Sequence, residues 1–324
     1  MREASDIRNV AVIGGGYVGR GVALQFALAD YRVLMFNRSP QSAARSRAEI
    51  EKSLGILIDA DALDDKQARA VSGRIAQTQD FREAAGGGDF VVEAVSEQLP
   101  LKQEVFEKMD AIAPPDVILA SETSGLGMTD ISARTRHPER CVVTHNYTPP
   151  HLVPVVEVAA GRRTSPDTTR ITCELLENAG KEPIVCREVP GHIGVRLTTA
   201  LRREAYHIVE KGYARPEDVD AVWRSIASLF PALGLCKLND FSGMDVLRDV
   251  HRNIQPSLDH RPQPGPLMDE MVEKNLLGLK SGEGFYKWTE ESAREAARAR
   301  DSELIRLYLK NNALERKTER NSDS

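Results

Sequence analysis

Apolar segments with two different spacings alternate along the first half of the chain. Short continuous apolar runs predict buried strands at 10–14, 32–36, 89–95, 117–121, 141–145 and 154–159. The longer segments between them repeat apolar residues every three or four positions, as helices do. One such helical face consists of Leu101, Val105, Phe106, Met109 and Ile112. Strands that alternate with helices in this way predict a mainly parallel sheet with helices on both faces.

The strand pattern ends near Pro190, and the rest of the chain has only the spacing of helices. A long amphipathic helix follows, which ends at Gly212 and carries on one face Ile193, Leu197, Leu201, Ala205 and Ile208. We therefore expect an α/β fold, with a doubly wound N-terminal domain at 1–189 and an all-helical C-terminal domain at 190–312 that takes part in substrate binding. The segment 313–324 ends in a polar run and is predicted to be disordered.

Composition narrows the classes of function. The 324 residues carry a net charge of −5 and show no basic stripe interleaved with aromatic residues, which argues against nucleic-acid binding. No apolar stretch is long enough for a membrane span and the charged N-terminus lacks a signal-peptide core, so we expect a cytoplasmic protein without membrane contact. The four cysteines are far apart and form no CxxC pair, so we expect buried thiols rather than a metal site or disulfides.

Three glycines follow the first predicted strand directly. Gly14, Gly16 and Gly19 form the pattern GxGxxG, whose last two variable positions are Tyr17 and Val18. The first glycine permits a tight turn, the second lets a pyrophosphate approach the backbone, and the third allows the helix to pack closely on the strand. Because the motif lies between a strand and a helix, it predicts a Rossmann-type dinucleotide-binding site formed by these residues. The alternative is a glycine turn with a structural role only.

The end of the second strand helps to identify the dinucleotide, because an acidic residue there binds the ribose of NAD. This chain has Asn37, Arg38 and Ser39 instead. An uncharged Asn37 does not repel a 2′-phosphate, and the guanidinium of Arg38 could bind one with paired hydrogen bonds, assisted by Ser39. These residues favour NADP(H), with NAD(H) as the alternative. In the simpler interpretation, Ser39 caps a helix that begins at Pro40, and Arg38 is solvated.

Five further motifs follow along the chain: VVEAVSEQLPLKQEVFEKMD, ILASETSGL, THNYTPPHLVPVVEV, PGHIGVRL and GLKSGEGFYKW. In order and spacing they resemble the L-3-hydroxyacyl-CoA dehydrogenase family, from about residue 8 to residue 290. The resemblance implies oxidation of a secondary alcohol, or reduction of the ketone, with a nicotinamide; the substrates are 3-hydroxyacyl-CoA thioesters or free 3-hydroxy acids, as in gulonate and carnitine dehydrogenases. It also implies a homodimer that pairs through the helical domain. Glu97 and Lys102, in the first motif, are expected among the cofactor-binding residues.

A histidine with a carboxylate partner can supply the proton transfer that such a reaction needs. His145 ends a predicted strand at the carboxyl edge of the sheet, where its ring could move the hydroxyl proton during hydride transfer. Glu157, in the next strand, is placed to accept a hydrogen bond from the other ring nitrogen. By the resemblance, these two form the family's catalytic dyad, and Ser124 is the serine that hydrogen-bonds the reacting oxygen. The alternative is a structural strand-end histidine with a solvated glutamate.

Three positions depart from the family pattern or add to it. Where many relatives have GFxxNRL, this chain has Val195 in place of the asparagine that helps to hold the substrate, and a valine donates no hydrogen bond. His192 lies three residues earlier on the same predicted helical face and could put a polar ring there; its ordinary interpretation is a surface residue at a helix start. His151 follows a double proline after His145 and could place a cation near a substrate carboxylate; its ordinary interpretation is a solvated loop residue.

We therefore predict an NADP- or NAD-dependent dehydrogenase that interconverts a 3-hydroxyacyl-CoA or a 3-hydroxy acid and its 3-keto form, with His145 as general acid and base. A biosynthetic NADPH-dependent β-ketoreductase with a substrate other than a CoA thioester is an alternative within the same chemistry. A different class of function is a catalytically weak nucleotide-binding protein with a structural or sensing role, like the lens crystallins that resemble this family. Cofactor binding without turnover of any 3-hydroxy or 3-keto compound would identify that class.

Overall fold

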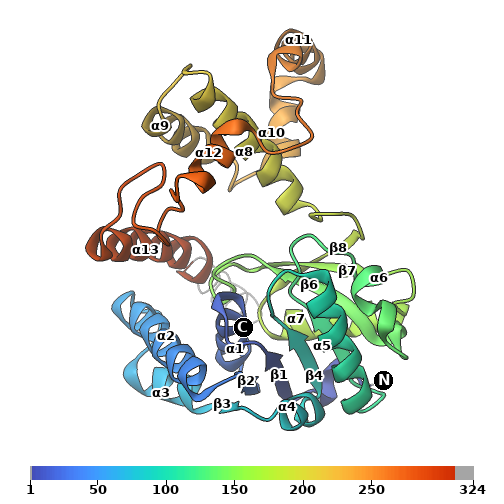
Figure 1. The fold of residues 1–324 in the computed structure, drawn as a ribbon. Helices are drawn as coiled ribbons and strands as arrows, with labels where there is room; N and C mark the ends of the chain where they lie inside the picture. The colour runs from blue at the N-terminus through green and yellow to red at the C-terminus, as the bar shows by residue number, and fades with distance from the viewer. Residues whose placement is uncertain (1, 311–324) are drawn as a thin grey trace, which may run out of the picture. The chain divides into compact units, whose positions relative to one another are not determined.

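Eight strands form a single sheet in the structure, a computed structural model that describes residues 2–310. Their order across the sheet is β3-β2-β1-β4-β5-β6-β7-β8 (Figure 1). The strands are β1 (Asn9–Ile13), β2 (Arg32–Phe36), β3 (Ile75–Thr78), β4 (Phe90–Glu93), β5 (Ile118–Ser121), β6 (Cys141–Asn146), β7 (Val155–Ala160) and β8 (Glu182–Arg187). All neighbouring strands are parallel except β6 and β7, which are antiparallel. The predicted mainly parallel sheet is therefore confirmed.

Two strands, β3 and β8, have no counterpart among the predicted ones. β3 has the sequence IAQT and lies at one edge of the sheet, next to β2. β8 has the sequence EPIVCR and lies at the other edge, where Ile184 and Val185 are exposed. An edge strand is covered on fewer sides than a central one, so neither strand has the continuous apolar run that marks the central strands.

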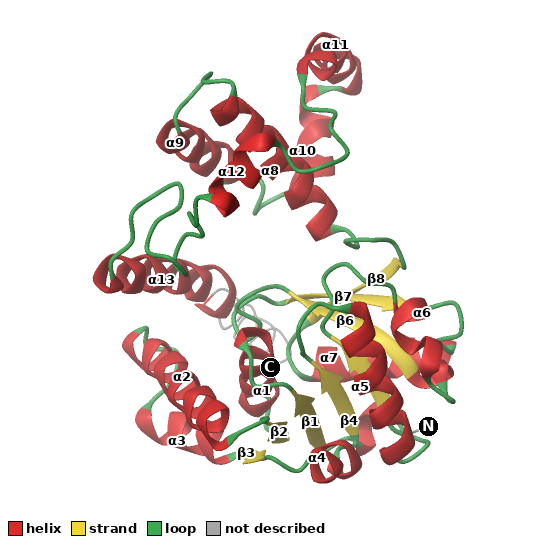
Figure 2. Cartoon of the chain, viewed as in Figure 1, coloured by secondary structure: helices red, strands yellow, loops and turns green. Residues whose placement is uncertain are grey.

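Helices cover both faces of this sheet (Figures 1 and 2). In the sheet-bearing part of the chain they are α1 (Tyr17–Leu28), α2 (Pro40–Asp59), α3 (Asp65–Gly73), α4 (Phe81–Gly87), α5 (Leu99–Ile112), α6 (Met128–Ile131) and α7 (Pro166–Asn178). Short 3₁₀ turns lie at Ala4–Asp6, Ser132–Arg134 and Pro138–Arg140. Serine side chains cap α2 and α7, each followed by a proline at the start of the helix, so these helices begin where the sequence signals a start.

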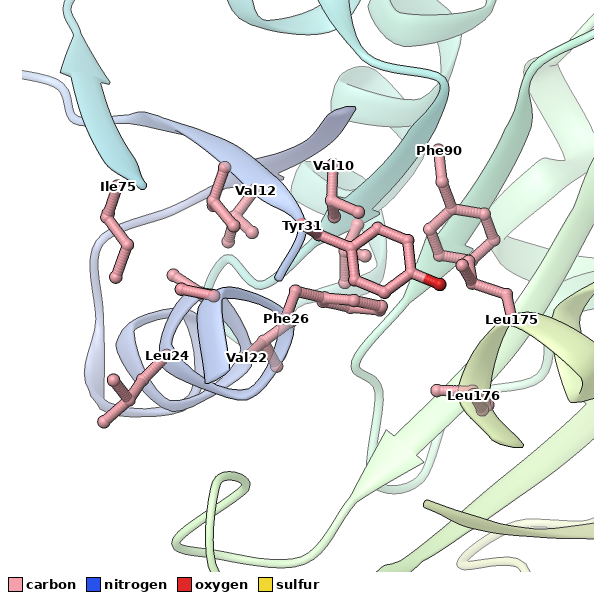
Figure 3. Close-up of a cluster of buried hydrophobic side chains, with 14 of the residues drawn as sticks. Val10, Val12, Val22, Leu24, Phe26, Tyr31, Ile75, Phe90, Leu175 and Leu176 are labelled. Carbon is pink, nitrogen blue, oxygen red and sulfur yellow. The ribbon is translucent and has the colours of Figure 1, made fainter. Parts of the chain in front are cut away.

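The hydrophobic core has two layers, one on each face of the sheet. Successive residues of a strand point to opposite faces, so Val12 of β1 belongs to the layer that contains Phe26 of α1 and Leu175 of α7 (Figure 3). Its neighbour Ile13 belongs to the other layer, which contains Phe106 of α5. Because the central strands are buried on both faces, they give rigid support to the loops that leave their carboxyl ends.

The chain divides into two compact units. Among the described residues, 2–195 and 296–310 form the first unit, which contains the sheet, and Arg196–Glu295 form the second, which is helical. The helices after the sheet are α8 (Gly194–Glu210), α9 (Pro216–Ala227), α10 (Gly234–Ser242), α11 (Met244–Ile254), α12 (Pro266–Glu273) and α13 (Glu290–Leu304), with a 3₁₀ turn at Gln255–Ser257 and a π-helical segment at Ile305–Lys310. An α/β unit with an appended helical one agrees with the predicted fold class.

The C-terminal segment returns to the first unit. Ile305 is 1% exposed and belongs to the core layer of Val12 and Phe26. Residues 296–310, which the sequence places in the helical domain, therefore pack with the sheet-bearing unit, where Ile305 is buried and Leu304 is partly buried. The segment 313–324, predicted to be disordered, lies outside the described residues.

Two predictions about the chain as a whole have mixed outcomes. No helix within residues 2–310 combines the length and the apolar character that a membrane crossing requires. Cys141 is buried as predicted, but Cys173 and Cys186 are only partly buried and Cys236 is exposed. The prediction of buried thiols is therefore wrong for Cys236, which lies in the helical unit on the exposed helix α10.

Candidate active site

His145 and Glu157 face each other across the antiparallel pair of strands. The register of β6 and β7 places the two residues directly opposite each other. Nδ1 of His145 lies 2.8 Å from Oε2 of Glu157. Both side chains are buried, with exposed fractions of 6% for His145 and 2% for Glu157. The structure thus brings the two residues of the expected dyad into a direct hydrogen bond away from water.

The backbone holds the second carboxylate oxygen of Glu157. Its Oε1 accepts hydrogen bonds from the N–H groups of Ile193 (2.8 Å) and Gly194 (2.9 Å), where α8 begins. Burial alone would raise the pKa of Glu157, but the hydrogen bonds from His145, from these N–H groups and from the Tyr147 hydroxyl outweigh it, and the pKa is lowered. Glu157 is therefore ionised at neutral pH and holds a proton on Nδ1 of His145, which leaves Nε2 for a reacting oxygen.

Tyr147 completes this group, and the sequence did not predict it. Its ring lies 4.9 Å from the ring of His145, between centroids, in an edge arrangement. Burial and then the hydrogen bond to Glu157 raise the pKa of the tyrosine hydroxyl, which therefore stays protonated and acts as a donor. A side chain at Gly194 would collide with this hydroxyl. The signal that could have found Tyr147 is its spacing, because it lies two residues after His145 on the same side of an extended chain.

Ser124 lies in the loop after β5, at the same edge of the sheet as His145. Oε1 of Glu97 organises this loop, because it accepts hydrogen bonds from the Thr123 hydroxyl (2.6 Å) and from the next two backbone N–H groups (3.0 Å each). Burial would raise the pKa of Glu97, but these hydrogen bonds and the charge of Lys102 lower it. The loop is thus fixed by an ionised carboxylate, while the side chain of Ser124 remains exposed to a ligand.

Lys102 supports Glu97 from the protein interior. Its ammonium group is fully buried and lies 2.9 and 3.0 Å from the two carboxylate oxygens of Glu93 and 3.3 Å from Oε2 of Glu97. A buried cation needs such partners, and here two carboxylates provide them. The sequence predicts Lys102 among the cofactor-binding residues; in the structure its ammonium group is paired with Glu93 and Glu97 and does not line the cavity beside the glycine loop.

A cavity of about 770 Å³ lies beside the glycine loop. Of the residues predicted to bind the cofactor, it is lined by Gly14, Gly16, Tyr17, Asn37 and Arg38. A Cβ atom on Gly16 would point into open space, whereas a Cβ atom on Gly19 would collide with the backbone of Gly14. Gly19 therefore serves the close packing of α1, as does its neighbour Val18, which packs against the core. The open side of Gly16, at the start of α1, fits the pyrophosphate of a dinucleotide.

The three residues after β2 differ in their positions: two line the cavity and the third caps a helix. Asn37 is 1% exposed, and its Oδ1 lies 3.0 Å from the hydroxyl of Ser46, while its Nδ2 has no hydrogen-bond partner among the described residues. Arg38 is exposed and lines the cavity. Ser39 accepts a hydrogen bond from the backbone N–H of Ser42 (3.2 Å) and caps α2, as in the simpler interpretation of this residue. Of these three residues, Asn37 and Arg38 line the cavity and Ser39 does not.

Two further arginines, Arg20 and Arg45, line the same cavity, and the sequence did not predict them. Arg20 lies in α1, one position after the glycine motif, and Arg45 lies in α2. Burial lowers the pKa of Arg20; Glu49 opposes this effect and the nearby Arg45 adds to it. Positive charges that share a cavity favour the binding of an anion between them. The signal that could have found Arg20 is its position directly after GxGxxG.

The structure contradicts the expected position of His192. The residue precedes α8 instead of lying on its first turn, and only 1% of it is exposed, so it is not a surface residue. Its φ of 45° is in the left-handed region, which costs a residue with a side chain roughly 1–2 kcal/mol. Its ring lies 5.9 Å from the ring of His145. His192 and Val195 therefore do not share a helical face, because the left-handed turn at Gly191 and His192 redirects the chain.

His151 does not supply the positive charge that the sequence predicts. Burial, with added effects from Lys181 and Arg300, lowers the pKa of His151 to about 4, so its ring is uncharged at neutral pH. The ammonium group of Lys181 donates hydrogen bonds to the carbonyl oxygens of Pro150 (2.5 Å) and Val153 (2.9 Å) and so holds the loop that carries His151. The prediction of a cation at His151 is wrong, because burial, together with the nearby charges of Lys181 and Arg300, disfavours the protonated ring.

This is the architecture of a dehydrogenase that works with a nicotinamide dinucleotide, since a cofactor cavity and a pair suited to proton transfer lie at the same edge of one doubly wound sheet. Comparison with known families gives the same class. The model "3-hydroxyacyl-CoA dehydrogenase, NAD binding domain" matches residues 9–189, and "3-hydroxyacyl-CoA dehydrogenase, C-terminal domain" matches residues 191–288. The chain belongs to the 3-hydroxyacyl-CoA dehydrogenase family, as its motifs predict.

Individual relatives cover nearly the whole chain. It is 34% identical over 307 residues to 5-formyl-3-hydroxy-2-methylpyridine 4-carboxylate 5-dehydrogenase of Mesorhizobium japonicum, with 94% of this chain and 98% of the relative covered. It is 30% identical over 289 residues to the mitochondrial hydroxyacyl-coenzyme A dehydrogenase of Sus scrofa, with 87% and 91% covered. A solved structure of a 5-formyl-3-hydroxy-2-methylpyridine 4-carboxylic acid 5-dehydrogenase, described as an NAD⁺-dependent dismutase, has a TM-score of 0.85 at 32% identity, with 93% and 97% covered.

Proposed function

We propose that this enzyme interconverts a 3-hydroxy acid, or its CoA thioester, and the 3-oxo form, with His145 as its general acid and base. The observation that carries the proposal is the 2.8 Å hydrogen bond between Nδ1 of His145 and the ionised carboxylate of Glu157. A histidine oriented in this way can accept a proton at Nε2 from the substrate and return it. The carboxylate stabilises the imidazolium that forms when it does so.

Each residue of the site has a defined task in the proposed reaction. In oxidation, Nε2 of His145 accepts the proton of the substrate hydroxyl while the carbon that carries this hydroxyl gives up a hydride. A bound nicotinamide dinucleotide supplies the acceptor for that hydride. The hydroxyl of Ser124 donates a hydrogen bond to the reacting oxygen and helps to hold it beside His145. In reduction, the imidazolium of His145 returns the proton to the same oxygen.

We favour a free acid over a fatty-acyl thioester as the substrate. One relative is named for a pyridine carboxylate and another for hydroxyacyl-coenzyme A, and the first covers the larger share of this chain. Val195, at the position of the family's substrate-holding asparagine, supplies no hydrogen bond to a substrate from its side chain. A pocket built for a different acid would not need that amide.

Turnover assays with wild type and one variant test the mechanism. The panel consists of 3-hydroxybutyrate, acetoacetate and their CoA thioesters, followed by cofactor absorbance. His145→Ala should lower the rate by ~10²–10⁴, the usual size of a general acid–base contribution, with cofactor affinity unchanged. His137→Ala is the matched control, because His137 is an exposed histidine that is paired with Glu139 at 3.2 Å; it should behave as wild type.

Two results would overturn the mechanism. Full activity of His145→Ala would mean that another group moves the proton. Cofactor binding by the wild type, without turnover of any compound of the panel, would favour the catalytically weak binding protein instead.

We propose NADP(H) as the preferred cofactor, with NAD(H) as the alternative. The support is a set of donors beside the glycine loop, where Arg20, Arg38 and Arg45 line the cavity together with Asn37. The Nδ2 group of Asn37 has no partner among the described residues and can donate to an anionic oxygen. An acidic residue at this position would repel a 2′-phosphate, and asparagine does not. The NAD⁺ dependence stated for the solved relative is the reason to keep NAD(H) as the alternative.

Titration of both cofactors tests this preference directly. The wild type should bind NADPH at least about tenfold more tightly than NADH, because one charge-assisted hydrogen-bonded pair contributes ~1.5–3 kcal/mol. The preference should weaken as salt rises. Asn37→Asp combined with Arg38→Ala should reverse it, whereas Arg47→Ala, an exposed arginine on the same helix α2, is the matched control. A wild type that prefers NADH would remove the NADP(H) proposal and leave the dehydrogenase proposal intact.

We also propose a homodimer that forms through the helical unit. In the described structure, none of the residues of α8 to α12 is buried. Large apolar side chains are exposed there, among them Trp223, Ile226, Phe241, Met244 and Val250. A surface of this kind is usually covered by a partner.

Solution mass tests the homodimer. Light scattering should give twice the chain mass of 35.8 kDa. Phe241→Asp should shift the protein toward the monomer, whereas Lys237→Asp, an exposed polar position on the same helix α10, should not. A monomeric wild type would refute the proposal, and fractionation of source cells would test the predicted cytoplasmic location.

A further inference from the structure

His192 is a buried polar side chain that borders the proposed active site. Only 1% of it is exposed, and its ring lies 5.9 Å from the ring of His145, with an angle of 36° between the two planes. Neither of its ring nitrogens has a hydrogen-bond partner among the described residues. The backbone of Thr123 raises the pKa of His192 through a contact that falls short of full hydrogen-bond geometry, so the ring is near both His145 and the loop that carries Ser124.

The backbone at this position is unfavourable as well. φ is 45° at His192 and 79° at Gly191, and the left-handed region suits glycine but not histidine. This turn directs the N–H groups of Ile193 and Gly194 onto Glu157. A buried polar ring without partners, at a strained position beside the proposed catalytic residue, indicates a ligand that completes its hydrogen bonds.

The ring of His192 is uncharged in these surroundings. Burial lowers the pKa of His192 and the nearby His145 lowers it further, whereas Glu157, the backbone of Thr123 and Glu188 oppose this effect without offsetting it. An uncharged imidazole has one N–H donor and one acceptor nitrogen. It can therefore donate to a neutral or an anionic oxygen, while His145 beside it exchanges the proton.

We propose that His192 binds a second oxygen of the substrate, the C1 oxygen of a 3-hydroxy or 3-oxo acid or thioester, while His145 binds the oxygen on C3. The proposal rests on the proposed function and deepens it. The two oxygens of such a substrate are close together, and two rings 5.9 Å apart can each reach one of them. His192 thus supplies a polar contact where the family pattern GFxxNRL has phenylalanine, in a chain whose Val195 lacks the amide of that pattern.

His192→Phe tests this contact, because phenylalanine keeps a buried planar ring but has no hydrogen-bonding group. With 3-hydroxybutyrate and 3-hydroxybutyryl-CoA as probes, KM for the probe that the wild type turns over should rise ~10–100-fold. The unfolding temperature should not fall, because two unpartnered nitrogens are removed. His192→Asn keeps a donor and an acceptor and tolerates the left-handed backbone, so its KM should stay within about fivefold of the wild type.

A second measurement uses the unmodified protein and needs no turnover. Wild type with ¹⁵N-labelled imidazole groups is mixed with oxidised cofactor and acetoacetate or acetoacetyl-CoA, and the resonances of His192 are assigned by their absence in His192→Asn. They should shift when the probe is added, and they should also shift in His145→Ala, where the proposed C1 contact remains.

The outcomes separate this inference from the proposed function. An unchanged KM in a folded His192→Phe, or His192 resonances that do not move at saturating probe, would overturn the inference. Turnover by the wild type and its loss in His145→Ala would then still support the proposed function. A wild type that turns over no compound of the panel would overturn both.

Discussion

Replacing Glu157 with glutamine changes the charge of the central pair without changing its size. The carboxylate accepts hydrogen bonds from His145, from the Tyr147 hydroxyl and from the backbone N–H groups of Ile193 and Gly194. Glutamine keeps one acceptor oxygen and turns the other into an NH₂ donor. The backbone N–H groups cannot turn away, so the amide oxygen should stay with them and the NH₂ group should face Nδ1 of His145.

The expected loss of rate follows from that arrangement. An NH₂ group facing Nδ1 keeps the ring proton of His145 on Nε2, the nitrogen that has to accept the substrate proton, and the imidazolium loses its counter-charge. The lost charge-assisted hydrogen bond is worth ~1.5–3 kcal/mol. At ~1.4 kcal/mol per factor of ten, this lowers kcat by about 10- to 150-fold. The acid limb of the pH–rate profile for oxidation should move to lower pH, because the imidazolium form is less stable.

The assay is steady-state turnover of wild type and Glu157→Gln across the neutral pH range. Tyr147→Phe is the matched control, because it removes one donor to the carboxylate and leaves the charge in place, so its kcat should fall only a few-fold. Thermal unfolding should show that both variants are folded. Wild-type kcat with an unshifted pH profile, in a folded Glu157→Gln, would refute the role of Glu157 in supporting His145.

Three further changes test other parts of the structure. Glu122 is buried, and burial raises its pKa to about 7. The stability gained from its protonated form is therefore fully present below the ordinary value near 4.5 and is lost as pH rises through 7. At ~1.36 kcal/mol per pKa unit this loss amounts to about 3 kcal/mol of unfolding free energy. Glutamine does not ionise, so the stability of Glu122→Gln relative to wild type, measured by urea unfolding, should rise by up to that amount from about pH 5 to about pH 8. The same stability difference at both pH values would contradict this. Gly16→Ala places a methyl group in open space beside the proposed pyrophosphate site, so the dinucleotide Kd should rise about tenfold or more. The unfolding temperature should not change, because a φ of −71° suits any residue. An unchanged Kd would place the pyrophosphate elsewhere. Val195→Asn should raise kcat/KM for 3-hydroxybutyryl-CoA without improving turnover of the true substrate, and efficient oxidation of that thioester by the wild type would show that the pocket is not specialised.

The central pair and the glycine loop could be predicted because each depends on local sequence. His145 and Glu157 are twelve residues apart and end up opposite each other in one antiparallel strand pair. Residues opposite each other in such a pair share a face of the sheet. The glycine loop is contiguous, and its geometry follows from a strand that is followed by a helix. The central pair and the glycine loop both lie in short stretches of sequence whose strands and helices the apolar pattern already predicts.

The remaining contributors come from separate elements, and this is why the sequence did not reveal them. Arg45 reaches the cofactor cavity from α2, and its place there depends on how α2 packs beside α1. Lys102 was expected at the cofactor, but its place inside the sheet-bearing unit gives it Glu93 as a partner. No spacing rule relates such residues, because their contacts form only when distant elements pack together.

Three histidines of this region show why residue type alone does not define a role. His145 has a carboxylate opposite it in the sheet, so its ring has a fixed orientation. His151 stays uncharged, because burial lowers its pKa and the charges of Lys181 and Arg300 lower it further. His192 has neither kind of partner among the described residues, and a left-handed turn places it beside His145. The sequence predicts proton transfer for His145 and leaves two interpretations open for each of the other histidines. In the structure the neighbours orient His145, leave His151 uncharged and leave the ring nitrogens of His192 without a partner among the described residues. The left-handed turn before α8 therefore places a second imidazole ring beside His145 in the proposed pocket.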